Sequence, residues 1–236
     1  MTQVAASKLE RAVAAICPDI KHRVSERVLD LSETQLWWEL SCCLLSSQVP
    51  YNLAVGAADA LEGSNLLMNS SIPCATLALS IEEILRESVF VNGKRQAYRF
   101  SKSRAQQLAS TQNAVALSAK SLTELLASFE TAIVARNWLV KNAPGIGPKQ
   151  ASMFLRNSGR SYDLAIIDRH VLNYMAILGI AEHRGRKVSS LAKYKEFECD
   201  LREHAKKMGV AVGLLDWAIW IVMKAARDIN LEEHYL

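Results

Sequence analysis

The feature that most constrains how this chain folds is the stretch NAPGIGPK, residues 142–149. It separates two helical patterns, at residues 130–142 and 148–157, so the chain must reverse direction between them. Its two glycines permit positive φ angles and the close approach of another backbone. Pro148 suits the first turn of a helix, where its missing N–H leaves no hydrogen bond unmade. The stretch therefore predicts two helices joined by a tight turn.

The rest of the chain also favours helices. Glycine and proline are sparse, with 10 and 5 of 236 residues, and strand-like alternation is rare, which predicts an all-α protein. Further helical patterns lie at residues 2–16, 33–47, 52–62, 80–88, 101–119, 168–178, 190–207 and 213–228. Ser32 with Gln35, and Ser121 with Glu124, have the spacing of a capping box, which marks the start of a helix.

A chain of 236 residues is long enough for two lobes that share a cleft. We expect a discontinuous division. Residues 32–120 would form a central helical lobe, and residues 1–31 with residues 121–236 would form a second lobe. That second lobe would contain the two hairpin helices, residues 130–157, and Asp168.

Charge and cysteine content narrow the class of protein. The net charge of +4 suits a polyanionic partner, although many proteins without such a partner are mildly basic. No apolar run approaches the length of a membrane span, and residues 1–8 lack the regions of a secretion signal, so we expect a cytoplasmic protein. The five cysteines are odd in number and form no C-x-x-C, which argues against a disulfide framework or a zinc site.

The tight turn is a candidate binding site. The start of a helix leaves backbone N–H groups without partners, and those of Gly145, Ile146 and Gly147 would point outward. Such groups, helped by the positive end of the helix dipole, bind a DNA phosphate without regard to base sequence. Glycine-rich turns also join helices in proteins that do not bind DNA, so the turn alone leaves both interpretations open.

Lys149, at the start of the second helix, is a candidate nucleophile. Its charge meets the positive end of the helix dipole, which disfavours the ammonium form and favours a free amine. Asp168 follows the apolar residues 164–167 and precedes a helix that it would cap. A carboxylate close to the lysine suits glycosidic cleavage, because it stabilises oxocarbenium-like charge while the amine attacks C1′ of the sugar. Taken singly, the two are an ordinary surface lysine and an ordinary helix cap.

These segments resemble a known enzyme family. Residues 138–157 and 163–170 closely resemble the helix-hairpin-helix DNA glycosylases, and most closely the second class of 8-oxoguanine DNA glycosylase/AP lyase. Further matches lie at residues 39–48, at residues 98–100 with 104–105, and at residues 215–216 with Trp220. The resemblance implies an all-α, two-lobed fold with a cleft between the lobes. It also implies a double-stranded DNA substrate whose damaged nucleotide is flipped out of the stack.

The resemblance assigns roles to individual residues. Lys149 would be the nucleophile that forms a Schiff base and starts β-elimination, and Asp168 would be the essential carboxylate. Gln48 matches the region that probes or fills the gap left by the flipped base. Trp220, with Asp216 in the same matching segment, would lie near the base pocket. Because the amine provides the nucleophile, we expect no cofactor and no catalytic metal.

Four further assignments stay open. Arg104 could contact a DNA phosphate or belong to a solvated helix face. His170 could donate a hydrogen bond to DNA or to Asp168, or form a structural hydrogen bond. The basic segment 183–187 could touch the DNA backbone or form a solvated turn. Trp220 lies three residues after another tryptophan on a predicted helix, a spacing that core packing also explains.

The chain departs from the family at both ends. Residues 1–31 look like an extra helical segment, and residues 221–227 continue a helix where the family typically has a glycine- and lysine-containing tail that helps to recognise the base. The expected substrate is 8-oxoguanine opposite cytosine, with another damaged or modified base as the alternative. A DNA-binding module without chemistry is a further alternative, although it would need neither Lys149 nor Asp168. We expect a monomer in a prokaryotic cell, associated with the nucleoid.

Overall fold

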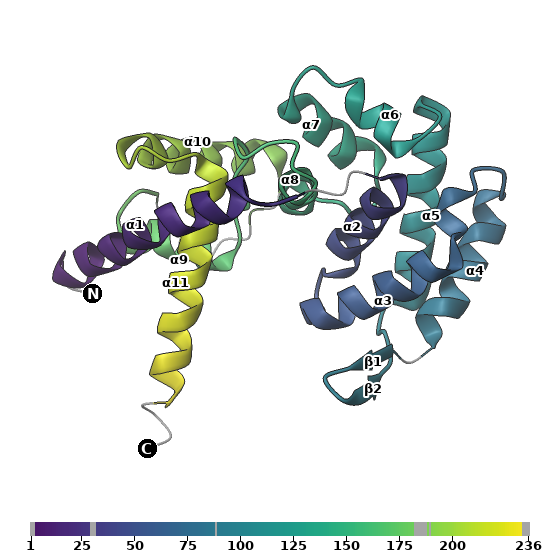
Figure 1. Ribbon diagram of the computed structural model, residues 1–236, viewed down its shortest axis with the longest axis horizontal. Coiled ribbons are helices and arrows are strands. Elements are labelled where there is room, and N and C mark those ends of the chain that lie inside the picture. The colour runs from purple at the N-terminus through teal and green to yellow at the C-terminus, as the bar shows by residue number, and fades with distance from the viewer. Residues whose placement is uncertain (1–2, 29–31, 88, 182–187, 189, 233–236) are drawn as a thin grey trace. The chain divides into compact units, whose positions relative to one another are not determined.

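The computed structural model, which describes residues 3–28, 32–87, 89–181, 188 and 190–232, is almost entirely helical (Figure 1). The predicted all-α class is therefore confirmed. Within the described ranges the only strands are two of three residues each. The basic segment 183–187 lies outside the described residues.

The chain divides into two compact units. The central unit comprises Leu29–Arg160, and the terminal unit combines Met1–Val28 with Ser161–Leu236. The sequence had led us to group the hairpin helices, residues 130–157, with the two chain ends. In the structure they are grouped with the central segment, because the second hairpin helix packs against the first helix of that segment.

The central unit consists of helices and one small β-hairpin. In chain order its elements are α2 (Glu33–Leu45), α3 (Tyr51–Ser64), the 3₁₀ helix η1 (Leu66–Met68), α4 (Cys74–Arg86), β1 (Val89–Val91), β2 (Lys94–Gln96), α5 (Ser101–Ser118), α6 (Leu122–Ala127), α7 (Ala132–Asn142) and α8 (Pro148–Asn157). α4 lies beside α5, and α2 lies beside α3. The core between them is rich in fully buried aliphatic side chains, among them Leu40, Leu44, Leu61, Leu77, Ile81, Leu85 and Leu108.

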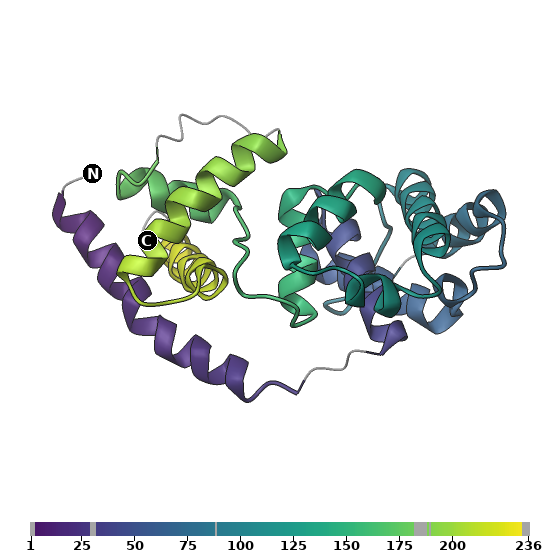
Figure 2. The same ribbon diagram turned by 90° about the horizontal axis from the view of Figure 1, so that it is seen from above.

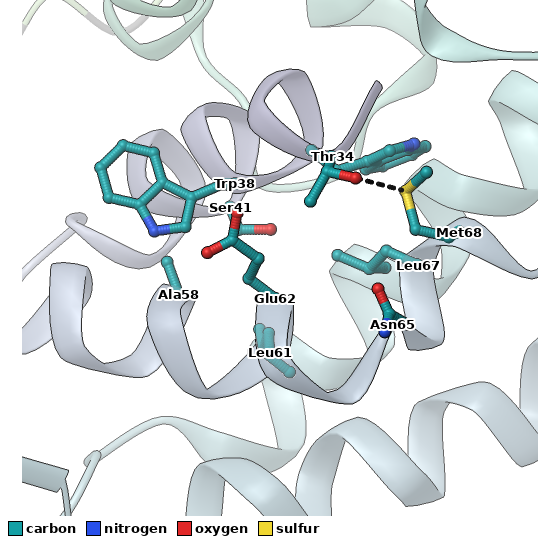
Figure 3. A pocket seen from close by; sticks show the side chains of 10 residues that line it. Thr34, Trp38, Ser41, Ala58, Leu61, Glu62, Asn65, Leu67 and Met68 are labelled. Atoms are coloured by element: carbon teal, nitrogen blue, oxygen red, sulfur yellow. Dashed lines mark hydrogen bonds between the residues drawn. The ribbon is translucent and has the colours of Figure 1, made fainter. Parts of the chain in front are cut away.

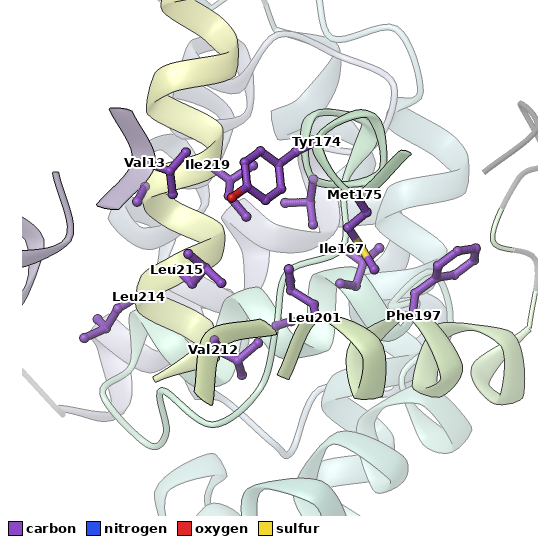
Figure 4. Close-up of a cluster of buried hydrophobic side chains, with 14 of the residues drawn as sticks. Val13, Ile167, Tyr174, Met175, Phe197, Leu201, Val212, Leu214, Leu215 and Ile219 are labelled. Atoms are coloured by element: carbon purple, nitrogen blue, oxygen red, sulfur yellow. The ribbon is translucent and has the colours of Figure 1, made fainter. Parts of the chain in front are cut away.

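In the described residues, the terminal unit has four helices. They are α1 (Gln3–Ser25), α9 (Arg169–Ile177), α10 (Leu191–Lys207) and α11 (Val212–Glu232). α1 and α11, from the two ends of the chain, lie side by side (Figures 1 and 2). Figure 4 shows the apolar side chains that these helices bury together, including Val13, Tyr174, Met175, Leu201, Leu215 and Ile219. In the described part of the chain no single helix is long and apolar enough to cross a membrane, and α10 and α11 pass that test only as a pair bent by 92°.

The predicted helix caps are present. The Ser32 side chain accepts a hydrogen bond from the backbone N–H of Gln35 (3.3 Å), and the Ser121 side chain accepts one from that of Glu124 (3.0 Å). The Glu124 carboxylate in turn accepts from the N–H of Lys120 (2.8 Å). These side chains satisfy N–H groups that a helix start leaves open, and so α2 and α6 begin at the predicted positions.

The first helix is longer than predicted. We expected it over residues 2–16, ending before Pro18, but α1 runs from Gln3 to Ser25 with the proline inside it. Pro18 has no N–H to donate to the preceding turn, which weakens the helix locally. Packing outweighs this loss, because the buried face continues on both sides of the proline at helical spacing, through Val13, Cys17 and Ile20.

α4 begins earlier than predicted. The helical pattern lies at residues 80–88, but α4 already starts at Cys74, directly after Pro73. The apolar side chains that it buries begin before position 80, at Leu77 and Ala78, and continue through Ile81 and Leu85. Because the buried residues recur at helical spacing from Leu77 onward, the helix includes the residues before position 80. Ser80 therefore lies inside α4.

Asn92 and Gly93 form the turn of a β-hairpin. Both residues have positive φ angles, +50° and +76°, as the tightest hairpin turns require. They join β1 to β2 in an antiparallel pair, with Val91 opposite Lys94. The strands themselves were not predicted, since three residues are too few to show an alternating pattern.

Candidate active site

The turn between α7 and α8 has the predicted tight geometry. The N–H of Ile146 donates to the carbonyl of Ala143 (3.0 Å), and Gly145 has a φ of +86°. Gly147 is the N-cap of α8, and Pro148 occupies its first turn. A left-handed residue at the position of Gly145 reverses the chain, and Pro148 starts the second helix without leaving an N–H group unpaired.

This turn presents free backbone donors. Among the described residues, the N–H groups of Gly145, Gly147 and Lys149 donate to no protein acceptor. They lie at or just before the first turn of α8, where the dipole of a 10-residue helix adds positive potential. Free N–H groups at a helix N-terminus suit an anion, and a DNA phosphate is an anion of the right size.

Lys149 is the second residue of α8 and is half-buried. Within the described residues of the central unit it forms no ion pair, so its amine is not occupied by a carboxylate of that unit. Two contacts hold α8 in place. Glu39 of α2 accepts a hydrogen bond from the side chain of Asn157 (2.7 Å), and Arg136 of α7 donates to Ser152 (3.3 Å).

Gln48 lies in the turn between α2 and α3. Its side chain is exposed, and its φ of +67° is unusual for a residue other than glycine. Two buried side chains hold the carbonyl groups just before it. The Tyr98 hydroxyl donates to the carbonyl of Leu45 (2.7 Å), and Arg104 donates to that of Ser47 (3.3 Å).

Arg104 has internal partners. Its side chain is buried, and its guanidinium donates to the side chain of Gln107 (2.7 Å) as well as to Ser47. The two terminal nitrogens of the guanidinium each donate within the protein, and the third, Nε, is buried without a partner among the described residues. This arrangement argues against direct contact of Arg104 with DNA and favours a supporting role for it.

Asp168 caps α9, as its position predicted. One carboxylate oxygen, Oδ1, accepts from the N–H groups of His170 (2.8 Å) and Val171 (3.0 Å). In the described structure the other oxygen, Oδ2, has no protein donor. His170 therefore donates to Asp168 through its backbone N–H, and Oδ2 of the carboxylate is left to interact with a ligand.

Three buried side chains hold the extended segment that leads to Asp168. The N–H groups of three consecutive residues each donate to one of them: Ala165 to Glu198 (2.9 Å), Ile166 to Asp216 (2.6 Å) and Ile167 to Tyr194 (3.0 Å). These bonds replace the backbone partners that an extended segment has in a sheet. Asp216 is 2% exposed and supports this segment through that bond.

Sequence reasoning did not find Glu198 and Tyr194. A signal was available, because Glu198 lies on the buried face of α10 at helical spacing from Tyr194 and Leu201. A carboxylate on an apolar helix face is rarely buried without a partner. Its partner, the N–H of Ala165, lies on a different segment, and the sequence pattern does not indicate which one.

Trp220 is 40% exposed on α11, and the Lys224 ammonium lies 4.8 Å from the centre of its ring. It is therefore not a core residue, which removes the packing explanation for its spacing. One turn further along α11, Met223 lines a shallow, open cavity of about 320 Å³ together with Arg169, His170 and Asn173 of α9. This cavity lies in the terminal unit. Arg169, one of the residues that line it, directly follows Asp168 in the chain.

A second cavity, in the central unit, is too small for a base. It lies between α2 and α3 and measures about 10 Å³, room for a single water (Figure 3). Ser41 lines it, and the hydroxyl of Ser41 has no hydrogen-bond partner among the described residues. One bound water would satisfy that hydroxyl, and no larger ligand fits.

Known proteins are similar to this chain in sequence and in fold. A protein of Korarchaeum cryptofilum named 8-oxoguanine DNA glycosylase/AP lyase is 30% identical over 203 residues, which cover 86% of this chain and 87% of the relative. A protein of Saccharolobus solfataricus with the same name is 33% identical over 209 residues, covering 86% of this chain and 92% of the relative.

Solved structures are also similar to this chain in fold. The 8-oxoguanine DNA glycosylase of Thermotoga maritima has a TM-score of 0.67 and 27% identity, covering 93% of this chain and 96% of its own. The enzyme of Methanocaldococcus jannaschii, in complex with a 15mer DNA containing 8-oxoguanine, has a TM-score of 0.70 and 25% identity, covering 94% of this chain and 98% of its own. The sequence model of the Ogg-HhH family, described as 8-oxoguanine DNA glycosylase, matches residues 20–210. The chain therefore belongs to the Ogg-HhH family of 8-oxoguanine DNA glycosylases.

Proposed function

We propose that this protein is a bifunctional enzyme of base excision repair, which removes 8-oxoguanine from duplex DNA and then cleaves the strand as an AP lyase. The observation that carries this proposal is the position of Lys149, at the end of a turn in which the N–H groups of Gly145 and Gly147 are free to bind phosphate. Membership of the Ogg-HhH family supports both the substrate and the two activities.

The proposed chemistry uses two side chains. The Lys149 amine attacks C1′ of the flipped nucleotide, a C–N bond to the lysine forms, and the bond between C1′ and the base breaks. Asp168 stabilises the positive charge that develops on the sugar. The departing base takes a proton, and the amine loses one. The bond between C1′ and O4′ then breaks, O4′ takes a proton, and the opened sugar is joined to the lysine as a Schiff base. The Schiff base acidifies C2′, and loss of that proton expels the 3′ phosphate by β-elimination.

Other side chains would prepare the nucleotide for this step. C1′ of a stacked nucleotide is out of reach of an amine, so the nucleotide must leave the duplex. We assign Gln48 to the gap that it leaves, in keeping with its exposed position in a turn that Tyr98 and Arg104 hold. We assign Trp220 and the shallow cavity beside His170 to the extruded base and its phosphate.

Borohydride trapping tests the proposal directly. Borohydride reduces a Schiff base to a stable amine, so wild-type protein should form a covalent complex with duplex DNA containing 8-oxoguanine. Lys149→Gln should form none and should still bind the duplex. Lys141→Gln, which removes an exposed lysine from the other hairpin helix, should trap like wild type. If the wild-type protein binds the duplex but forms no covalent complex, the proposal fails and the protein is a DNA-binding module without catalytic activity.

A different damaged or modified base is the second candidate substrate. The observation that favours it is α11, which continues as a helix to Glu232, where the family typically has a tail that helps to recognise the base. Trapping across a panel of lesions, each opposite each of the four bases, decides between the two. If another lesion is trapped faster than 8-oxoguanine opposite cytosine, that other base is the substrate.

We further propose that the protein acts as a monomer on chromosomal DNA in a prokaryotic cell. The named relatives from archaea support the cell type. One protein chain per duplex in a sedimentation experiment is the expected result, and a stoichiometry of two would contradict it.

A further inference from the structure

Two side chains of α5 connect the turn that carries Gln48 with the hairpin turn at Gly145. Arg104 donates to the carbonyl of Ser47 (3.3 Å) through one nitrogen and to the Gln107 side chain (2.7 Å) through another. The Gln107 amide lies directly against Gly145. All five residues belong to the central unit.

The contact between Gln107 and Gly145 leaves no room for a larger residue. A Cβ atom added to Gly145 would lie 2.6 Å from Cδ of Gln107 and 3.0 Å from its Nε2. A free glutamine side chain could swing away from such a clash. Here the hydrogen bond from Arg104 fixes the amide, so the amide and the hairpin turn constrain one another.

At the other end of the connection, Arg104 supports a strained turn. The carbonyl that it binds belongs to the residue just before Gln48, whose φ of +67° costs energy for a residue with a side chain. Such a conformation persists only where the surroundings hold it. Arg104 and the Tyr98 hydroxyl are the side chains that hold the carbonyl groups of this turn.

We propose that Arg104 and Gln107 are positioning residues, which keep Gln48 and the phosphate-binding turn at Gly145 in a fixed relation so that both engage the DNA at once. Neither side chain touches the substrate in this role. The inference rests on the proposed function, because it assigns Gln48 to the gap in the duplex.

This role predicts a split between the two activities. Base excision requires a grip on the backbone and a residue that fills the gap in the duplex at the same time. Cleavage at a ready-made abasic site requires the grip and the lysine, but no base has to be extruded. Loss of the connection should therefore slow excision more than it slows abasic cleavage.

The main test compares Gln107→Ala with Gln106→Ala. Gln106 is exposed on the same helix and bonds only Ser110 of its own helix (3.4 Å), so it is a matched control. We expect Gln107→Ala to slow single-turnover excision of 8-oxoguanine about tenfold, while cleavage of a duplex with an abasic site falls by less than about threefold. The control should match wild type in both assays. Equal losses in the two assays, or none, would overturn the proposal.

A second test separates positioning from direct phosphate contact. A lysine or arginine that binds a phosphate contributes about one unit to the slope of log Kd against log salt concentration. Arg104→Gln should keep the wild-type slope and should show the same excision defect as Gln107→Ala. A slope lowered by about one unit would make Arg104 a DNA contact and contradict the proposal.

The double variant tests whether the two residues act as one connection. Because both residues belong to one connection, Arg104→Gln combined with Gln107→Ala should excise no more than about twofold more slowly than the slower single variant. Losses that multiply would show two independent effects and would overturn the connection. Failure of the proposed function is distinguishable from all of these, since wild-type protein itself would then release no 8-oxoguanine.

Discussion

The carboxylate of Asp168 accepts a hydrogen bond from the backbone N–H of His170 through only one of its two oxygens. Oδ1 lies 2.8 Å from that nitrogen, and it also accepts the next N–H along α9, whereas Oδ2 has no protein donor among the described residues. Asp168 therefore has two separable properties. An uncharged oxygen at Oδ1 can cap the helix, but only a carboxylate can stabilise positive charge on a sugar.

The first prediction follows from this separation. Asp168→Asn keeps an oxygen for the cap, so its melting temperature should stay close to that of wild type, whereas Asp168→Ala should lose about 1 kcal/mol of stability. Both variants should excise 8-oxoguanine at least about a hundredfold more slowly, because both lack the charge. Thermal unfolding and single-turnover excision measure the two effects. The exposed Asp163→Asn is the control, and full activity in Asp168→Asn would remove the carboxylate from the mechanism.

The second prediction concerns Gly145. Gly145→Ala places a side chain at a φ of +86° and against Gln107, so it should cost more than the roughly 1–2 kcal/mol of left-handed strain alone. Gly93→Ala is the matched control, since Gly93 has a φ of +76° and no atom within 4 Å of the added Cβ. Both variants should lose stability in urea unfolding, but only Gly145→Ala should also bind duplex DNA more weakly. Wild-type affinity in that variant would mean that the turn does not bind the phosphate.

Much of the fold follows from short stretches of sequence. The caps at Ser32 and Ser121 and the helix start at Pro148 were all predicted, because each depends on residues that lie close to one another in the chain. The all-α class follows in the same way from the period of the apolar residues. The early start of α4 and the passage of α1 through Pro18 were missed, because packing outweighs local preference there.

The supporting contacts of the candidate site could not be predicted from local sequence. Arg104 and Ser47 are 57 positions apart, and Glu198 and Ala165 are 33 positions apart. No pattern within a helix length selects one such partner over many others. The sequence thus indicates residues whose chemistry is distinctive, such as Lys149, but it leaves open the residues that hold them.

The third prediction concerns the cysteines, all five of which are free. Burial raises the pKa of the Cys42 and Cys43 thiols, with neighbouring charge from Glu39 adding to the effect, so they should not form thiolates in the folded protein. Cys199 is exposed and should react first with a thiol reagent. Mass spectrometry after brief labelling checks the order, and Cys199→Ser should lose the fast phase. Rapid labelling of Cys42 or Cys43 without denaturant would show that α2 opens in the native state.

The fourth prediction concerns pH and the stability of the terminal unit. Burial lowers the pKa of His204 below its ordinary value of 6.5, and Lys207 acts in the same direction, while Glu10 on α1 opposes them. The Tyr174 hydroxyl on α9 lies 3.1 Å from the Nε2 atom of His204. The folded protein thus binds this proton more weakly than the unfolded chain does. Protonation consequently favours the unfolded chain as the pH falls below about 6.5, and the free energy of unfolding should decrease.

His204→Gln tests this assignment, because glutamine keeps a polar group near Tyr174 and does not titrate. One proton linked to unfolding changes the free energy by at most about 1.4 kcal/mol per pH unit. Urea unfolding between about pH 7.5 and about pH 5.5 should therefore show a shallower loss of stability in His204→Gln than in wild type. His22→Gln, at an exposed position of α1, should keep the wild-type slope. If wild type and His204→Gln lose stability in parallel over this range, the acid sensitivity arises from other groups, since the buried imidazole then takes up its proton equally well in both states.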